Sequence, residues 1–94
     1  MKYALDRTSA FKRDYKRVQR RHLPISKLQK VVAKLANGEP LSTANRDHAL
    51  TGDWANHREC HITSDWLLIY QVKENVLVLE LTRTGSHSDL YYFL

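Results

Sequence analysis

Histidine, arginine and aspartate residues in the second half of the sequence have the side-chain chemistry of a nuclease. The set consists of His48, His61, Asp65, Arg83 and His87. Cleavage of RNA without a metal ion needs a base to deprotonate a 2′-hydroxyl, an acid to protonate the departing 5′-oxygen, and a cation to stabilise the phosphorane. Histidine titrates near neutral pH and suits the first two roles, whereas arginine suits the third. The five residues therefore supply the groups that this reaction requires.

The residues around His61 predict a strand with one polar face. Successive side chains of a strand point to opposite sides of the sheet. His57, Glu59 and His61 would therefore share one face, and Cys60 and Ile62 would share the other. We expect the polar face to carry the candidate chemistry.

Two other interpretations fit the same residues. His57 and His61 could bind a metal ion together with Asp65, although the sequence contains no helical His-x-x-x-His pair and no zinc motif. The histidines could also lie on a solvated sheet face without any catalytic role. The residues alone leave acid–base catalysis, metal binding and a plain polar surface open.

The periodicity of the apolar residues predicts two helices before these candidates. Thr8 and Ser9 can cap a helix that runs to residue 21, with an apolar stripe that includes Phe11 and Val18. Leu23-Pro24 ends that helix, because the residue before a proline avoids helical geometry. A second helix follows from residue 25 until Asn37-Gly38 supplies its stop signal. A short link between them favours an αα-hairpin.

The rest of the chain predicts strands and one long loop. Residues 37–56 show no period, and a run of this length in a small domain favours a functional loop, which we expect Leu50 and Trp54 to hold against the core. Strands are predicted over residues 2–6, 57–62, 66–72 and 76–82. We therefore expect a single α+β domain over residues 1–94, with an antiparallel sheet made of the N-terminal strand and a three-strand meander. The two-helix hairpin would pack on one face of this sheet.

Basic residues are concentrated in the two predicted helices. Residues 1–34 contain eleven of the fifteen lysines and arginines but two of the ten acidic residues, which gives this segment a charge of +9. Such a surface attracts polyanions, most commonly nucleic acid. The first helix has too narrow an apolar stripe to favour a membrane surface instead. We predict that it contacts RNA through Lys12, Arg13, Lys16, Arg17 and Arg20.

Length and composition limit the class of protein. Ninety-four residues suffice for one small domain, and the apolar fraction of 43% is typical of a globular protein. The single cysteine, Cys60, cannot form an internal disulfide. The N-terminal segment resembles neither a signal peptide nor a membrane span, so the sequence predicts a cytoplasmic protein that does not bind a membrane.

Three ordered blocks of the sequence resemble motifs of a known family. Residues 46–54 read RDHALTGDW, residues 58–70 read RECHITSDWLLIY, and residues 83–87 read RTGSH. Their order and spacing, the chain length and the two-helix opening resemble the YafQ-type branch of the RelE-like bacterial toxins. The resemblance covers essentially the whole chain.

The resemblance implies a fold, an activity and partners. Such toxins have a RelE-like fold and are ribosome-dependent endoribonucleases that cut mRNA in the ribosomal A site without a cofactor. They would contact 16S rRNA and mRNA, and a cognate antitoxin would hold them inactive, with two toxins on one antitoxin dimer. In this sequence His48, His61, Asp65 and His87 would form the acid–base set, and Arg83 would bind phosphate. Tyr91 would take the place of the family's terminal aromatic residue, where phenylalanine is usual.

Two alternative functions remain open at this point. A noncatalytic module that binds RNA or ribosomes would need the basic helices but not the histidines. A metal-dependent hydrolase would lose its activity to a chelator.

Overall fold

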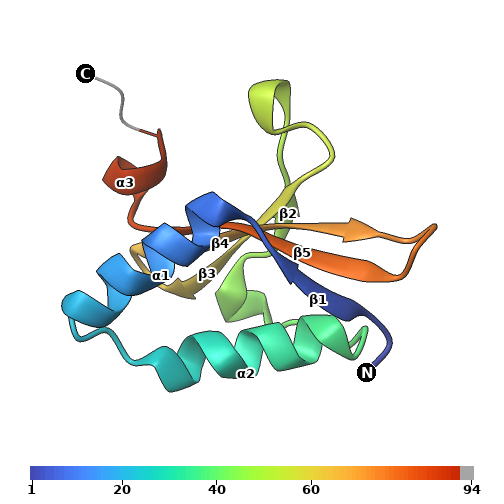
Figure 1. The fold of residues 1–94 in the computed structure, drawn as a ribbon, viewed down its shortest axis with the longest axis horizontal. Coiled ribbons are helices and arrows are strands. Elements are labelled where there is room, and N and C mark those ends of the chain that lie inside the picture. The colour runs from blue at the N-terminus through green and yellow to red at the C-terminus, as the bar shows by residue number, and fades with distance from the viewer. Residues whose placement is uncertain (92–94) are drawn as a thin grey trace.

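The computed structural model describes residues 1–91 and consists of one sheet and the helices around it (Figure 1). Its strands are β1 (Ala4–Arg7), β2 (His48–Ala49), β3 (Arg58–Thr63), β4 (Trp66–Lys73) and β5 (Val78–Gly85). Its α-helices are α1 (Ser9–Arg20), α2 (Ile25–Ala36) and α3 (His87–Tyr91), and its 3₁₀ helices are η1 (Thr43–Asn45) and η2 (Gly52–Trp54). The strand order is β1-β5-β4-β3-β2. The α+β class is confirmed.

The sheet is mixed, so the prediction of an antiparallel sheet is wrong in part. The meander β3-β4-β5 is antiparallel as expected, but β1 pairs parallel with β5, with Ala4 opposite Val78. The backbone N–H of Thr8 also donates to the carbonyl of Leu81, 3.1 Å away. A parallel neighbour is possible because α1, α2 and three strands separate β1 from β5, which leaves ample chain for the crossover. The fifth strand, β2, lies inside the segment predicted as a loop.

Both predicted basic helices are present. Thr8 caps α1, because its Oγ1 accepts from the backbone N–H of Phe11 at 2.9 Å. The second helix, α2, ends at Ala36, and Gly38 follows with φ +73°, a left-handed conformation that glycine adopts without strain. The sequence signals therefore placed these boundaries to within a residue.

The two helices diverge rather than pack along each other, which corrects the expected αα-hairpin. Figure 1 shows α1 and α2 spreading apart from the turn between them. An apolar groove of about 330 Å³ separates them, with Phe11 and Tyr15 on one wall, Leu28 and Val32 on the other, and Leu5 of β1 at its edge. Both helices still cover one face of the sheet, because their apolar residues join the same core cluster.

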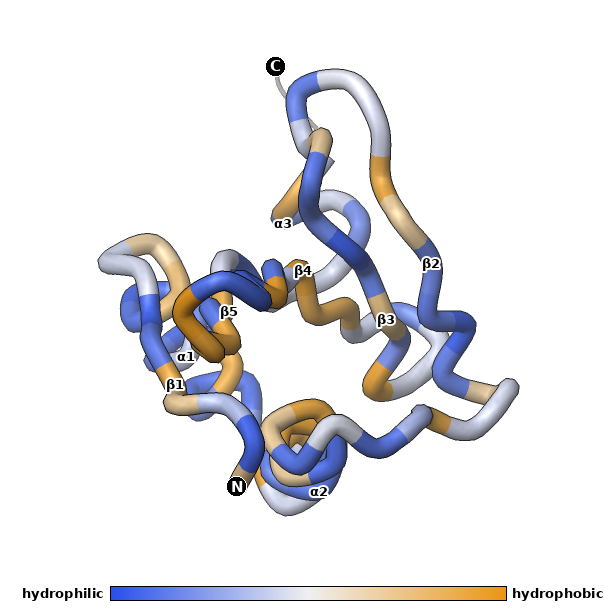
Figure 2. Tube along the Cα trace, turned by 90° about the vertical axis from the view of Figure 1, so that its right-hand side faces the viewer, coloured by the Kyte–Doolittle hydropathy of each residue, from blue (hydrophilic) through white to orange (hydrophobic). Residues whose placement is uncertain are grey.

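Each face of the sheet has its own apolar cluster. The larger contains Trp66, Leu68 and Tyr70 of β4 with residues of α1 and α2. The smaller contains Leu67, Ile69 and Leu90, with Leu50 and Trp54 packed against it as predicted. Figure 2 shows the apolar stretches of β4 and β5 in the middle of the molecule. No helix in residues 1–91 is long and apolar enough to cross a membrane.

The loop and the C-terminal tail contain short elements that the sequence pattern did not predict. The segment 37–56 includes η1, β2 and η2, and β2 places His48 opposite Glu59 of β3. The tail forms α3, whose Leu90 is buried against the second face of the sheet. Tyr92, Phe93 and Leu94 lie outside the described residues.

Candidate active site

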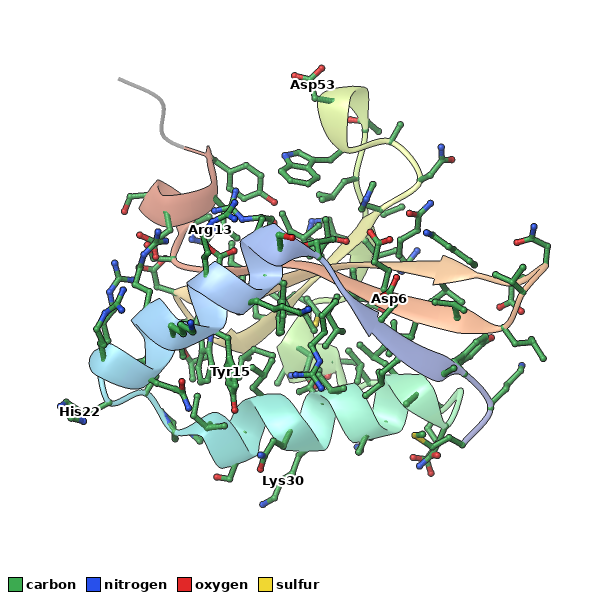
Figure 3. The ribbon with its side chains drawn as sticks, viewed as in Figure 1. Asp6, Arg13, Tyr15, His22, Lys30 and Asp53 are labelled. Atoms are coloured by element: carbon green, nitrogen blue, oxygen red, sulfur yellow. The ribbon has the colours of Figure 1, made fainter. Side chains whose placement is uncertain are left out.

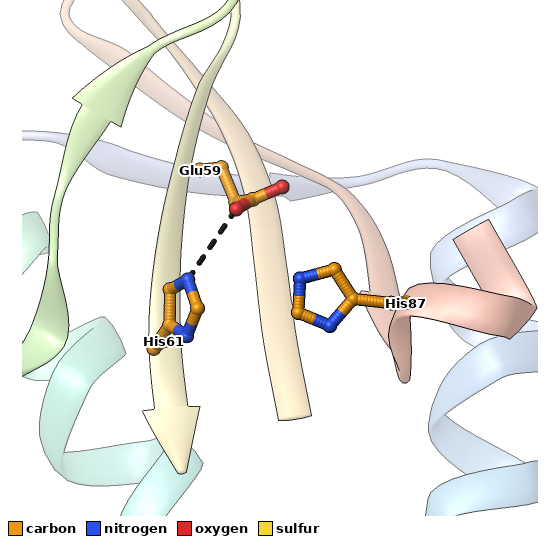
Figure 4. Close-up of side chains that lie close together, drawn as sticks. All are labelled: Glu59, His61 and His87. Carbon is orange, nitrogen blue, oxygen red and sulfur yellow. Dashed lines mark ion pairs between the residues drawn. The ribbon is translucent and has the colours of Figure 1, made fainter. Parts of the chain in front are cut away.

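A buried carboxylate, Glu59, lies at the centre of the candidate site. It occupies the polar face of β3 and is 5% exposed. One carboxylate oxygen lies 3.5 Å from Nε2 of His61 and 3.6 Å from Nε2 of His48, and the other accepts a hydrogen bond from the Tyr91 hydroxyl. Figure 4 shows His61 and His87 reaching toward this carboxylate from β3 and α3. Side chains from β2, β3 and α3 therefore come together at the predicted polar face.

His61 and His87 come together from distant parts of the sequence. Their ring centroids are 5.8 Å apart, with the rings inclined at 62°. A carboxylate oxygen of Glu59 and one nitrogen from each ring all lie within 4.8 Å of one another. His61 is largely enclosed at the sheet surface, whereas His87 projects from the first turn of α3 and is 55% exposed. A substrate can therefore approach the pair from the side of His87.

Asp65 fixes the orientation of His87. This aspartate lies in the turn between β3 and β4, and its Oδ1 is 2.8 Å from Nδ1 of His87 and accepts from the His87 backbone N–H at 3.1 Å. These hydrogen bonds lower the pKa of Asp65 below its ordinary value, so the carboxylate is ionised at neutral pH. With Nδ1 engaged, Nε2 of His87 is the nitrogen that can exchange a proton with a ligand.

His48 joins the cluster through β2. Its Nδ1 lies 2.7 Å from the carbonyl of Arg46, which is a hydrogen bond if Nδ1 carries the proton. Nε2 then faces Glu59. The neighbouring Asp47 holds this segment to the sheet, since it accepts hydrogen bonds from Tyr70 (2.5 Å) and Arg58 (3.3 Å). The structure thus brings together all four predicted acid–base residues.

Arg83, the predicted phosphate ligand, is paired with an aspartate of α1. Its Nε and Nη2 donate to Asp14 at 2.6 and 3.1 Å, and the backbone N–H of Thr84 donates to the same carboxylate at 3.2 Å. Asp14 is 2% exposed, whereas the Arg83 side chain is 24% exposed. Among residues 1–91, no hydrogen bond or ion pair joins Arg83 to the histidines. Arg83 therefore forms an ion pair with Asp14 inside the protein, besides any phosphate that it binds.

Tyr91 lies beside the histidines, at the end of α3. Its ring centroid is 6.3 Å from that of His87, and its hydroxyl donates to Glu59. Burial and this hydrogen bond raise the pKa of Tyr91 above its ordinary value, so the phenol stays protonated. The predicted aromatic residue therefore borders the site and also holds Glu59 in place.

The basic residues of α1 differ in their surroundings. Lys12, Arg13, Lys16 and Arg20 are exposed, and Figure 3 labels Arg13 among the side chains of this helix. Arg17 is half-buried, and its Nη1 lies 3.5 Å from Asp14 and 3.8 Å from Asp89. Four of the five residues predicted to bind RNA are thus open to a polyanion, and the fifth pairs with carboxylates.

The structure also identifies functional candidates that the sequence interpretation missed. Glu59 was placed on the polar face but was not proposed as a site residue, although its position between His57 and His61 was a usable signal. His57 instead packs against Trp54, with ring centroids 5.6 Å apart. The metal hypothesis named the wrong ligands, because within residues 1–91 the group that could hold a metal consists of Glu59, His61 and His87 rather than His57, His61 and Asp65.

Comparison with known proteins identifies the family. The family model described as the bacterial toxin of type II toxin–antitoxin system, YafQ, matches residues 3–92. The chain belongs to the YafQ toxin family. The resemblance stated from the sequence motifs is therefore confirmed.

Relatives of known structure share the fold of this YafQ-family chain. The mRNA interferase toxin YafQ of Escherichia coli (strain K12) is 34% identical over 93% of this chain and 94% of its own length. The crystal structure of the E. coli DinJ–YafQ complex matches with a TM-score of 0.87 at 32% identity, covering 95% of this chain and 98% of the other. A metal-bound toxin from Helicobacter pylori matches with a TM-score of 0.90 at 37% identity, over 95% and 99% of the two chains.

Proposed function

We propose that this chain is a ribosome-dependent endoribonuclease that cuts mRNA in the ribosomal A site by metal-independent acid–base catalysis and so inhibits translation. The observation that carries the proposal is the convergence of His61 and His87 on the buried Glu59. Two imidazoles at this separation can act on the two ends of one phosphodiester. The name of the E. coli relative, an mRNA interferase, supports RNA as the substrate.

Each side chain of the site has its own role in the proposed reaction. One imidazole of the pair takes the proton from the 2′-hydroxyl, and the other protonates the departing 5′-oxygen. Asp65 and Glu59 orient the rings and stabilise their protonated forms, the role that a carboxylate beside a catalytic histidine commonly has. His48 adds a third titratable group next to Glu59, and Arg83 is the candidate to stabilise the phosphorane.

We also propose that the chain works in the cytoplasm and is silenced by a cognate antitoxin. The E. coli relative is known in a complex with DinJ, which supports a protein partner of this kind. An acidic, partly disordered segment of such a partner would complement the basic α1 and cover the site. A heterotetramer with two toxins on an antitoxin dimer is the assembly we expect.

A second candidate function is metal-dependent hydrolysis. One carboxylate oxygen and two imidazole nitrogens within 4.8 Å of one another match the donors that zinc and copper prefer, and a metal-bound relative from H. pylori has been solved. Glu59, His61 and His87 would hold the ion, which would supply a Lewis acid at the position of the phosphate.

The function is tested by incubating the purified chain, either untreated or stripped with EDTA that is then removed, with defined mRNA in a Mg²⁺ buffer, with and without programmed ribosomes. We expect cleavage only when ribosomes are present, and at the same rate for the untreated and the stripped chain. Loss of cleavage after the toxin alone has been stripped with EDTA would favour the metal-dependent enzyme. Ribosome binding without cleavage in any arm would favour the noncatalytic module.

The charge of α1 gives a further prediction. Replacing Lys12, Arg13 and Lys16 with glutamine should weaken ribosome binding and lower the slope of log K against log salt by up to about 2–3, because fewer counterions are released. The matched control replaces three exposed lysines of α2, namely Lys27, Lys30 and Lys34. Ribosome pelleting over a range of salt concentrations measures both variants. Equal slopes for the two variants would show that α1 is not a preferred contact.

A further inference from the structure

The helix that carries His87 is too short to hold itself in place. Helix α3 spans five residues, His87–Tyr91, and an isolated helix of this length is unstable in water because nucleation is costly. Its order must come from contacts with the rest of the molecule. Leu90 and Tyr91 pack against the smaller apolar cluster, and Tyr91 and His87 hydrogen-bond to Glu59 and Asp65, but none of these contacts joins α3 to α1. A further attachment, to α1, would limit how far α3 can tilt about these contacts and would so fix the position of His87.

Asp89 provides that attachment through an arginine at the end of α1. The carboxylate accepts from Nη1 and Nη2 of Arg21 at 2.6 and 3.0 Å, a bidentate pair, and Arg17 lies 3.8 Å away. The same carboxylate accepts from the backbone N–H of Ser86 at 2.9 Å. The hydrogen bonds from Arg21 keep the pKa of Asp89 well below its ordinary value, so the pair is charged at neutral pH.

The backbone around Asp89 is shaped for this contact. Gly85 has φ +155°, and a Cβ built on it would lie 2.8 Å from Oδ2 of Asp89. Only glycine therefore lets the carboxylate approach the chain this closely. Gly85 ends β5, and His87 begins α3 two residues later. The glycine and the aspartate together set the angle at which α3 leaves the sheet.

We propose that Arg21 and Asp89 are positioning residues for the reaction proposed above. Their ion pair fixes α3 against the end of α1 and so holds His87 against Asp65, beside His61 and Glu59. The inference rests on the proposed function, since it assigns these residues a task in RNA cleavage. Neither residue touches the reacting phosphate in this role.

A positioning role and a stabilising role affect different measurements. Loss of a positioning residue lowers the cleavage rate, whereas loss of a stabilising residue lowers the melting temperature. The Arg21 side chain is 45% exposed and that of Asp89 is 14% exposed, so the pair lies at the surface with its arginine in solvent, and such a pair adds little to the stability of the whole fold. A displaced acid or base, in contrast, slows the chemical step, and a shift of about 1 Å can cost 10²-fold. The pair should therefore affect the cleavage rate of the bound complex far more than the melting temperature.

The experiment measures single-turnover cleavage on preformed toxin–ribosome–mRNA complexes, and ribosome affinity separately. Arg21→Ala and Asp89→Asn should each slow cleavage of the bound complex by roughly 10–100-fold. Arg21→Lys should recover part of the rate, because lysine can pair with Asp89 at one point. The control Lys30→Ala removes the same charge from α2, where the side chain points away from the molecule (Figure 3), and should cleave at the wild-type rate.

The two variants separate positioning from direct RNA binding because they change the net charge in opposite directions. Asp89→Asn removes a negative charge and keeps an acceptor for Ser86, so it should bind ribosomes at least as tightly as the wild type while cleaving slowly. Circular dichroism at the assay temperature corrects every rate for the folded fraction. An Asp89→Asn variant that cleaves at the wild-type rate, or an Arg21→Ala variant that loses only affinity, would overturn the inference. A wild-type chain that cuts no RNA on ribosomes would instead refute the proposed function.

Discussion

Replacing His87 with alanine should lower the rate of RNA cleavage by about 10²–10⁴ and leave the fold intact, because loss of a positioned general acid or base typically has an effect of this size. The ring is 55% exposed and its Nδ1 bonds to Asp65 at the surface, so truncation creates no cavity in the core. The measurement is the cleavage rate of mRNA on ribosomes, together with growth after induction in cells. The wild type should arrest growth, and the variant should not.

A second histidine serves as the matched control. His22 lies in the turn between α1 and α2, is exposed, and has φ +57°. His22→Asn removes an imidazole while keeping a residue type that tolerates left-handed geometry. This control should cleave RNA and arrest growth like the wild type. Equal toxicity of the His87→Ala and His22→Asn variants would refute the role assigned to His87.

The elements with a strong local pattern could be predicted from the sequence. The first helix, α1, has an apolar stripe and a capping threonine, and β3 alternates so that Glu59 and His61 point to one side and Cys60 to the other. These patterns depend on neighbouring residues alone. They predicted the helix boundaries and the polar face correctly.

The pairing of the edge strands could not be predicted in the same way. All four residues of β1 are exposed, so no alternation marks a buried face, and the partner β5 lies about seventy residues away in the sequence. The strand β2 has two residues, which is too short for a periodic signal. Parallel pairing and the fifth strand depend on where α1 and α2 carry the chain, which is a property of the tertiary structure.

The candidate site could likewise be predicted only in part from the sequence. The histidines could be selected by residue type and by the family motifs, and the structure gathers them, although their catalytic roles stay predictions. The contact partners depend on packing between distant elements. Asp14 of α1 meets Arg83 of β5, and Tyr91 meets Glu59, across 69 and 32 residues of sequence. No spacing rule connects such pairs, so the structural partner of Arg83 was missed.

Because Arg83 pairs with Asp14, it has two possible tasks. Each task predicts a different effect of mutating Arg83. As a phosphate ligand it would stabilise the charged phosphorane with its fork of donors. As the partner of Asp14 it neutralises a carboxylate that is 2% exposed. Its hydrogen bonds to Asp14 also raise the pKa of the guanidinium, so it is charged at every pH at which the protein works. A loss of activity in Arg83→Ala alone would not distinguish the two tasks.

Arg83→Ala should therefore lower both stability and activity. We expect the free energy of unfolding to fall by about 2–4 kcal/mol, somewhat below the cost of breaking a fully buried pair, because part of the arginine reaches solvent. Arg83→Lys should keep most of the stability, since an ammonium still pairs with Asp14, but should lose bidentate contact with phosphate. Urea unfolding and single-turnover cleavage measure the two effects separately.

The double variant Asp14→Asn with Arg83→Gln separates the tasks. Both charges are gone, so no carboxylate is left buried without a partner, and two amide side chains of similar size can hydrogen bond to each other. Its stability should recover most of the loss seen in Arg83→Ala, because the main cost in that variant is the buried Asp14 carboxylate, which keeps Arg17 at 3.5 Å and the Thr84 N–H but loses its shortest ionic contact. Its cleavage rate should stay low, because no cation faces the phosphate. If the stable double variant cleaves RNA at the wild-type rate, Arg83 acts only through Asp14, and another group must stabilise the phosphorane.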